Sequence, residues 1–377
     1  MASCRVCGSR SPLIASSLGA CAACIRAESP VLRAQIARLH AKTRRAFKLP
    51  PEPPHDPHGI RCDLCANQCQ IPCQGWGYCG LRRNENGRLV GGAPTQGSLS
   101  WYFDPLPTNC VADWVCPAGT GVGYPMWANR AGPEYGYANL AVFYQACSFN
   151  CLGCQNWHYR EGATATGKGV TPAALAAQVD TRTACICYFG GDPSPQFPHS
   201  VATAILARRR GQKRILRICW ETNGTMHPRW LRRAMGIALA SGGCIKFDLK
   251  AWDQAIHRAL TGFSNRWTLD NFQLAAEMAD TRPVPPALVA STLMVPGYVD
   301  AVQVGALARF IASINPDIPY TLLAFSPQFY LHDLPVTSTE HAEEALAAAK
   351  TAGLTRVRVG NIHLLGEAYG RSSGIAV

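Results

Sequence analysis

Apolar and polar positions follow two different patterns along the chain, and the change between them lies near residue 139. From there on, apolar runs rich in β-branched side chains alternate with amphipathic or Ala-rich segments, as buried strands and surface helices do. The predicted strands span residues 140–147, 183–191, 215–223, 244–250, 287–297, 320–327 and 356–365. The predicted helices span residues 172–179, 199–209, 228–240, 268–279, 300–313 and 340–353. This alternation predicts an α/β fold with a parallel sheet, either open or rolled into a full or partial (β/α) barrel.

Before residue 139 the patterns are shorter and predict small modules in front of the core. Residues 31–47 carry apolar side chains at helical spacing and predict an amphipathic helix. This helix ends at the Pro-rich segment 49–59, because proline cannot continue a helix. We therefore predict four zones, namely a Cys-rich module over 1–28, a basic helix and linker over 29–59, a second Cys-rich region over 60–138 and a barrel core over 139–377.

Cysteine is unusually frequent, with 18 among 377 residues. The N-terminus lacks the charged and then apolar order of a signal peptide, and we find no apolar run of bilayer-spanning length. These features predict a cytoplasmic protein without membrane segments, in which metal or cluster binding explains the cysteines better than disulfides do. The net charge of +12 favours anionic partners such as nucleic acid, although a solvated helix face also explains the basic segment 31–48.

Three of the cysteines, Cys147, Cys151 and Cys154, lie in the segment CSFNCLGC. This segment follows the first predicted strand, and chemistry in barrels gathers at the carboxyl ends of the strands. A 4Fe–4S cubane usually takes four thiolates, so three thiolates leave one iron with an open position for a substrate or cofactor. The loop therefore predicts a catalytic cluster rather than a closed structural site.

The Cys-x3-Cys-x2-Cys spacing of this loop resembles the signature of the radical SAM superfamily. By that resemblance, the amino and carboxylate groups of S-adenosylmethionine (SAM) complete the coordination of the open iron. The resemblance also implies an electron donor such as a flavodoxin or a ferredoxin. One electron then cleaves SAM to methionine and a 5′-deoxyadenosyl radical, which takes hydrogen from a substrate.

Further segments at strand ends resemble those of pyruvate formate-lyase activating enzyme and its relatives. They are GGDPSP, ETNG, FDLK and MVPG. GGDP resembles the Gly-Gly-Glu-Pro segment of radical SAM enzymes, which implies that Gly190 and Gly191 approach SAM and that Asp192 accepts from its ammonium group. In the same way, Val295 and Pro296 of MVPG are implied to face the adenine.

The resemblance assigns the remaining strand ends to the polar parts of SAM. It implies that Asp248 and Lys250 act near the SAM carboxylate and ribose. It also implies that Glu221, Thr222 and Asp248 approach a monovalent cation. Buried charges need such partners, because an unpaired charge in an apolar barrel mouth is costly.

A second group of cysteines, in CDLCANQCQIPCQGWGYC, precedes the core. Its spacing, followed by Gly-Leu-Arg, resembles the segment before the core in radical SAM enzymes of the AmmeMemoRadiSam system. Four thiolates suit either a second 4Fe–4S cluster that relays electrons or structural zinc, and both alternatives stay open here. The predicted ligands are Cys62, Cys65, Cys69 and Cys79, to which Cys73, Cys110 and Cys116 could add. Four cysteines within predicted strands are expected to be packed thiols, namely Cys185, Cys187, Cys219 and Cys244.

The N-terminal cysteines form two Cys-x2-Cys knuckles, the spacing of a zinc ribbon. The predicted ligands are Cys4, Cys7, Cys21 and Cys24, with zinc as the expected metal and rubredoxin-like iron as the alternative. Such a ribbon is either a structural cap or a docking module for protein or nucleic acid, and the basic helix beside it suits both roles.

These motifs together predict a radical SAM oxidoreductase that abstracts hydrogen from a substrate. In its most concrete form the substrate is a protein glycine, as for the activating enzymes. One departure concerns LLAFSPQFY at the sixth strand, where Ser326 replaces the His of those enzymes. The alternatives are radical SAM modification of RNA or of a small molecule, and a non-enzymatic role in electron transfer or iron–sulfur sensing.

Overall fold

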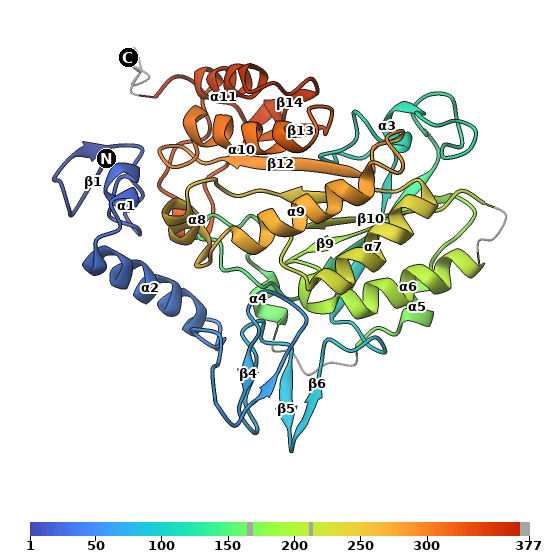
Figure 1. Cartoon of the computed structure of the whole chain (residues 1–377), viewed down its shortest axis with the longest axis horizontal. Helices are drawn as coiled ribbons and strands as arrows, with labels where there is room; N and C mark the ends of the chain where they lie inside the picture. Colours follow the sequence, from blue (N-terminus) through green and yellow to red (C-terminus); the bar gives the residue numbers. More distant parts are fainter. Residues whose placement is uncertain (164–168, 211–213, 370–377) are drawn as a thin grey trace, which may run out of the picture.

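The computed structural model describes residues 1–163, 169–210 and 214–369, and its centre is an eight-stranded sheet (Figure 1). The strand order is β14-β13-β12-β11-β10-β9-β8-β7, in which β8 to β14 are parallel and β7 is antiparallel. The strands are β7 (Leu99–Pro105), β8 (Ala138–Tyr144), β9 (Thr183–Gly190), β10 (Arg217–Thr222), β11 (Ile245–Asp248), β12 (Leu288–Met294), β13 (Tyr320–Ala324) and β14 (Val357–Gly360). The seven predicted strands and the α/β class are confirmed. Because β7 and β14 form the two edges, the sheet does not close into the full barrel, which was one of the predicted forms.

Helices connect the parallel strands and cover the side of the sheet that faces the viewer in Figure 1. They are α5 (Pro172–Ala176), α6 (Phe197–Arg210), α7 (Pro228–Ser241), α8 (Gln254–Thr261), α9 (Arg266–Ala279), α10 (Ala301–Ile314) and α11 (Thr339–Thr351). Helix α8 was not predicted, although its buried apolar residues Ala255, Ile256, Ala259 and Leu260 recur at helical spacing. The Asp253 side chain caps it by accepting from two backbone N–H groups, and Gly262 ends it at φ 86°.

Each strand places alternate side chains on opposite faces of the sheet. On β10, Ile218 and Trp220 are fully buried in the apolar core beneath the helices. The alternate side chains of the same strand, those of Arg217, Cys219 and Glu221, line a cavity on the other face. The concave face of the sheet is therefore polar and thiol-rich, whereas its convex face carries the core.

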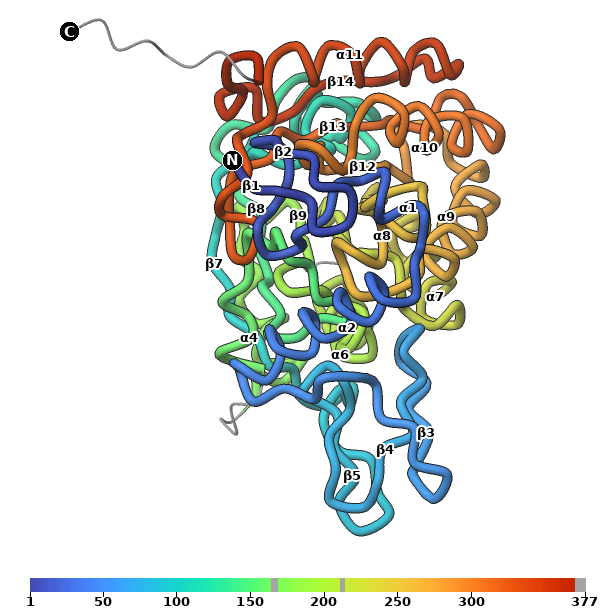
Figure 2. Tube along the Cα trace, turned by 90° about the vertical axis from the view of Figure 1, so that its left-hand side faces the viewer, coloured from blue at the N-terminus to red at the C-terminus, as the bar shows by residue number. Residues whose placement is uncertain are grey.

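The N-terminal residues pack against the barrel and then extend below it (Figures 1 and 2). Helix α2 matches the predicted amphipathic helix, and the Ser29 side chain caps it by accepting from Leu32 N. Ile14, Leu18 and Ile25 of the first zone belong to the same apolar core as the sheet. These elements are β1 (Ala2–Ser3), β2 (Arg10–Ser11), α1 (Ala22–Arg26), α2 (Pro30–Arg45), β3 (Ile60–Arg61), β4 (Gln70–Ile71), β5 (Arg83–Glu85) and β6 (Arg88–Val90).

Short helical turns complete the secondary structure. They are α3 (Pro117–Thr120), α4 (Tyr159–Gly162), and the 3-10 turns η1 (Ser194–Gln196), η2 (Phe329–Leu331) and η3 (Ile362–Leu364). Within the described ranges, no helix combines the length and the apolarity that a crossing of the bilayer requires.

Candidate functional site

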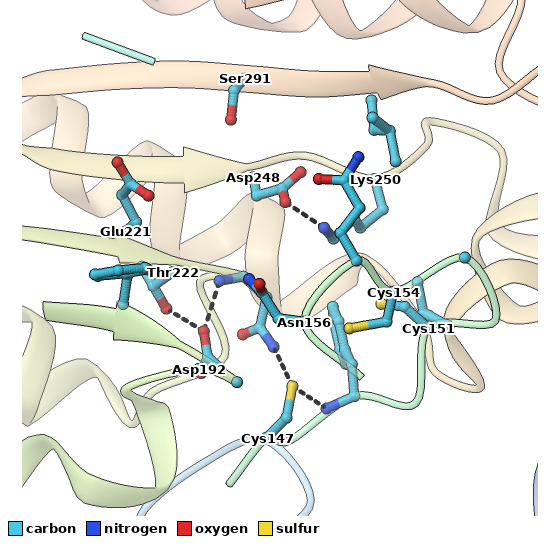
Figure 3. Close-up of a pocket in the computed structure, with 18 of the residues that line it drawn as sticks. Cys147, Cys151, Cys154, Asn156, Asp192, Glu221, Thr222, Asp248, Lys250 and Ser291 are labelled. Carbon is cyan, nitrogen blue, oxygen red and sulfur yellow. Dashed lines mark hydrogen bonds and ion pairs between the residues drawn. The ribbon is translucent and has the colours of Figure 1, made fainter. Parts of the chain in front are cut away.

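The CSFNCLGC loop lies at the carboxyl end of β8 and opens into a cavity of about 270 Å³ (Figure 3). Cys147, Cys151 and Cys154 all line this cavity. Cys147 is buried, and its sulfur accepts from Phe149 N at 3.4 Å. Burial raises the pKa of Cys151 to about 11, although the nearby charge of Lys250 opposes the rise. The three thiols thus share one space, and the charge of Lys250 favours the thiolate form of Cys151.

The asparagine within the loop connects it to the basic helix α2. The buried Asn150 side chain donates from Nδ2 to Thr43 Oγ1 at 2.7 Å and to His40 Nδ1 at 3.0 Å. Its Oδ1 accepts from Arg160 Nη2 at 3.1 Å. Burial lowers the pKa of His40 to about 4, so its imidazole is neutral near pH 7 and Nδ1 can accept. One face of the basic helix therefore supports the cysteine loop, a role that its charge pattern did not indicate.

The two glycines of GGDP allow β9 to pass close to the end of β8. A Cβ on Gly190, whose φ is +112°, would stand 2.5 Å from Tyr144 N. A Cβ on Gly191 would stand 2.3 Å from Ala146 O. Both glycines line the cavity, yet close backbone packing already requires them, independently of any ligand.

Asp192 is buried and accepts from three protein donors. Its Oδ1 accepts from Thr222 Oγ1 at 2.9 Å and from Asn223 N at 2.8 Å, and its Oδ2 accepts from Ser194 N at 2.8 Å. Burial raises the pKa of this carboxyl, and the hydrogen bonds oppose the rise. Asn223 in turn donates to Cys147 Sγ at 3.8 Å. Asp192 and Thr222 thus connect the GGDP and ETNG segments to the cysteine loop.

The FDLK segment presents an ion pair to the same cavity. Lys250 Nζ pairs with Asp248 Oδ2 (Figure 3), and this carboxylate raises the pKa of the lysine against the effect of burial. The other oxygen, Asp248 Oδ1, is buried without a hydrogen-bond partner in the described residues. Val295 also lines the cavity, whereas Pro296 is not among its described lining residues. An unpartnered carboxylate oxygen in a cavity is suited to a ligand hydroxyl or ammonium group.

Glu221 points toward a lysine that sequence reasoning did not consider. Its Oε1 lies 2.7 Å from Lys246 Nζ, and the charge of that lysine outweighs burial and lowers the pKa of Glu221. Lys246 is inward-facing on β11, two residues before Asp248, and the period of a strand could have indicated this. Glu221 therefore already has a cationic partner, and the monovalent-cation site stays a prediction.

The N-terminal cysteines form a compact group. The sulfur atoms of Cys4, Cys7, Cys21 and Cys24 all lie within 4.8 Å of one another, and Cys7 Sγ is 3.9 Å from Cys21 Sγ. Four thiolates at this spacing can bind a single metal ion tetrahedrally. The structure thus brings the four predicted ligands together. Their arrangement suits a zinc ion and an iron ion equally, so it does not choose between the two metals.

The second predicted group docks beside the catalytic loop. Ala66 N donates to Thr225 O at 2.8 Å, and Asn67 Nδ2 donates to Ser148 O at 2.9 Å, next to Cys147. Burial raises the pKa of Cys69 to about 12, and the charges of Cys79 and Cys62 add to the rise. Cys62, Cys65 and Cys69 are buried and Cys79 is half-buried, whereas Cys73 is exposed. Cys73 therefore differs from the four predicted ligands of this group, because its side chain is exposed to solvent.

Six further cysteines line a second cavity deeper in the barrel, which sequence reasoning missed. Four of them were expected to be packed thiols, and they are buried or half-buried as expected. They face an open space, however, together with two cysteines from the segment between β7 and β8. The six are Cys110, Cys116, Cys185, Cys187, Cys219 and Cys244.

Comparisons with known proteins show which proteins this chain resembles. A protein of Methanocaldococcus jannaschii described as uncharacterized is 24% identical over 322 residues, which cover 81% of this chain and 83% of that protein. The isethionate sulfite-lyase activating enzyme of Desulfovibrio desulfuricans is 32% identical over 137 residues, 36% of this chain and 40% of that enzyme. A solved domain of a pyruvate-formate lyase-activating enzyme from Bacteroides vulgatus has a TM-score of 0.37 and 21% identity, covering 46% of this chain and 97% of that domain. The model of the radical SAM superfamily matches residues 141–311. The chain therefore contains a radical SAM domain, as the cysteine loop predicted.

Proposed function

We propose that the protein is a radical SAM enzyme that cleaves SAM reductively and takes hydrogen from a substrate. The observation that carries the proposal is that Cys147, Cys151 and Cys154 share one cavity with the GGDP, ETNG and FDLK segments. When bound, a 4Fe–4S cluster with SAM supplies one electron to the sulfonium and so provides the 5′-deoxyadenosyl radical. All other contributions come from side chains of this chain.

Those side chains are suited to the amino-acid part and the ribose of SAM. Lys250 carries a positive charge suited to the SAM carboxylate, and the unpartnered Asp248 Oδ1 can accept from a ribose hydroxyl or an ammonium group. Asp192 holds the ETNG segment in position, and Asn223 of that segment holds Cys147. The apolar side chain of Val295 offers a surface for the adenine.

For the substrate we favour a glycine in a protein. Support comes from the 32% identity to an activating enzyme over 137 residues. The exposed basic side chains of α2 could contact an acidic partner protein, but they fit RNA as well. The substrate class is therefore the part of the proposal that most needs an experiment.

The first experiment tests SAM cleavage. The purified protein is reconstituted anaerobically with iron and sulfide, and 5′-deoxyadenosine is measured after dithionite and SAM are added. We expect product from wild type and from the matched control Cys73→Ala, whose thiol is exposed, and none from Cys151→Ala. A wild-type protein with a reducible cluster but no 5′-deoxyadenosine would overturn the enzymatic proposal in favour of electron transfer or sensing.

The second experiment tests the substrate class. Extracts of the source organism, grown on deuterated glycine, are added to the active enzyme, and deuterium in 5′-deoxyadenosine is measured by mass spectrometry. We expect enrichment that protease treatment of the extract removes and RNase treatment preserves. The opposite sensitivity would contradict the glycine proposal and favour RNA, and enrichment that survives both treatments would favour a small molecule.

For the N-terminal group we propose zinc. The four sulfur atoms lie within 4.8 Å of one another, as ligands of one ion do. We expect one zinc per chain by elemental analysis after expression with both zinc and iron in the medium, and none in Cys4→Ala/Cys7→Ala. Iron in place of zinc, with the visible absorption of a four-thiolate iron site, would contradict this assignment.

A further inference from the structure

The deeper cavity of the barrel is built from inward-facing positions of neighbouring strands. Its volume is about 150 Å³. Cys187 on β9 is paired in register with Cys219 on β10, and Cys244 precedes β11 on the other side, where its carbonyl accepts from Trp220 N. Cys110 reaches the same region from the segment between β7 and β8. Three adjacent strands and one loop thus bring four thiols to one space.

A lysine connects these thiols. Lys246 Nζ lies 3.1 Å from Cys110 Sγ and 3.2 Å from Cys187 Sγ, and its ion pair with Glu221 completes its contacts. The lysine is only 3% exposed. A buried ammonium group between two sulfur atoms stabilises thiolates, whereas inert packed thiols require no such partner.

The spacing of the thiols distinguishes a cluster from a single ion. Among the described residues, only the N-terminal cysteines form a group of three or more whose sulfur atoms all lie within 4.8 Å of one another. In the described part of the chain, neither the catalytic loop nor the deeper cavity holds three sulfur atoms that all lie so close together. In a cluster each thiolate binds a different iron, so wider spacing is expected there, whereas ligands of one zinc ion must crowd together.

We propose that this cavity binds an additional iron–sulfur cluster through Cys110, Cys187, Cys219 and Cys244. Four thiolates close the coordination of such a cluster, and Lys246 balances part of its negative charge. The remaining two thiols, Cys116 and Cys185, pack against a shared apolar group, and Cys116 also packs against the group that contains Cys110, Cys219 and Cys244. We do not assign them as ligands, because the four assigned thiols already close the coordination of a cluster. The cavity shares Phe189, Glu221 and Lys246 with the catalytic cavity, so this cluster would lie at the inner end of the space where SAM reacts.

The test counts iron and sulfide per chain after anaerobic reconstitution of the full-length protein. We expect Cys187→Ala/Cys219→Ala to lose the iron of one cluster, about two to four atoms. The matched control Cys116→Ala/Cys185→Ala, in the same cavity, should keep the wild-type iron content. Both variants should retain the SAM-dependent change in the electron paramagnetic resonance spectrum of the catalytic cluster, which also reports that the barrel is folded. Equal iron in wild type and Cys187→Ala/Cys219→Ala would overturn the proposal.

A second variant leaves the deeper cavity untouched, so the test does not depend on how well that part of the core tolerates substitution. Cys147→Ala/Cys151→Ala/Cys154→Ala/Cys62→Ala/Cys65→Ala/Cys4→Ala/Cys7→Ala lacks the catalytic ligands, two of the upstream ones and two of the N-terminal ones. We expect it still to bind one cluster, with equal amounts of iron and acid-labile sulfide, and negligible sulfide would refute the inference. The proposed SAM cleavage is judged separately by 5′-deoxyadenosine from wild type. If the barrel substitutions remove that product but no iron, the cavity is a substrate pocket and not a cluster site.

Discussion

Substitution of Glu134 tests how the segment between β7 and β8 is held against the barrel. Glu134 is fully buried, and it forms an ion pair with Arg217, the first residue of β10, which is 2% exposed. Its Oε1 accepts from Arg217 Nη1 at 2.8 Å and from Asn129 N at 2.7 Å. The substitution Glu134→Gln keeps the shape of the side chain but leaves the guanidinium group buried without a counter-charge.

The expected loss is large because neither partner can be solvated. Removal of one member of a buried ion pair costs about 3–5 kcal/mol. The matched control is Asp113→Asn, which breaks the pair of Asp113 with Arg358 in the same segment. Those two side chains are 29% and 30% exposed, and a pair screened in this way contributes up to about 1 kcal/mol. The two substitutions should therefore differ severalfold in their effect on the free energy of unfolding.

The assay is urea unfolding of the metal-loaded protein, followed by tryptophan fluorescence, because Trp220 lies fully buried in the core. The double variant Glu134→Gln/Arg217→Met should recover much of the lost stability, because it removes the buried charge as well. If Glu134→Gln costs no more than Asp113→Asn, or if the double variant is no more stable than Glu134→Gln, the reasoning is wrong.

Three further expectations follow from buried hydrogen bonds and charges. Asn150→Ala removes the 3.1 Å acceptor of the buried Arg160, which keeps only the longer bonds to Trp157 O and Cys151 O. It should lower stability by about 1–3 kcal/mol and speed cluster loss, measured as iron released to a chelator. Tyr298→Phe removes bonds to Ala15 N and Ala20 O, both 3.0 Å, and should accelerate metal release from the N-terminal group, followed with a zinc dye; an unchanged rate would contradict the coupling. Burial alone would raise the pKa of Glu134, but Arg217 lowers it below 4.5. The stability from this pair should therefore be complete above pH 4.5 and lost as the pH falls further. Below pH 4.5 the urea midpoint of wild type should accordingly fall more steeply with decreasing pH than the urea midpoint of Glu134→Gln.

Local patterns were sufficient for the elements and for the catalytic loop. The strand period and the Ala-rich segments located all seven parallel strands, because buried strands and amphipathic helices differ in periodicity over a few residues. The spacing of Cys147, Cys151 and Cys154 likewise places three predicted ligands within one short loop. Helix α8 was missed although its apolar residues follow the helical period, with Ile256 and Leu260 one turn apart.

Contacts between distant segments could not be read in this way. The role of Asn150 depends on His40 and Thr43, which lie 110 and 107 residues away in the chain. The basic helix therefore looked like a docking surface in the sequence, although one of its faces supports the catalytic loop.

The sequence by itself determined the fold class, the radical SAM loop and the N-terminal metal-binding group, because each depends on residues close together in the chain. Only the tertiary structure decided what the strand cysteines face. Cys187 and Cys219 belong to neighbouring strands and Cys244 directly precedes a third, and the register of the sheet brings them to one layer with Lys246. The alternation along a single strand predicts which of its side chains share one buried face. Whether that face packs against apolar side chains or lines a cavity with other thiols depends on strands that are far away in the sequence.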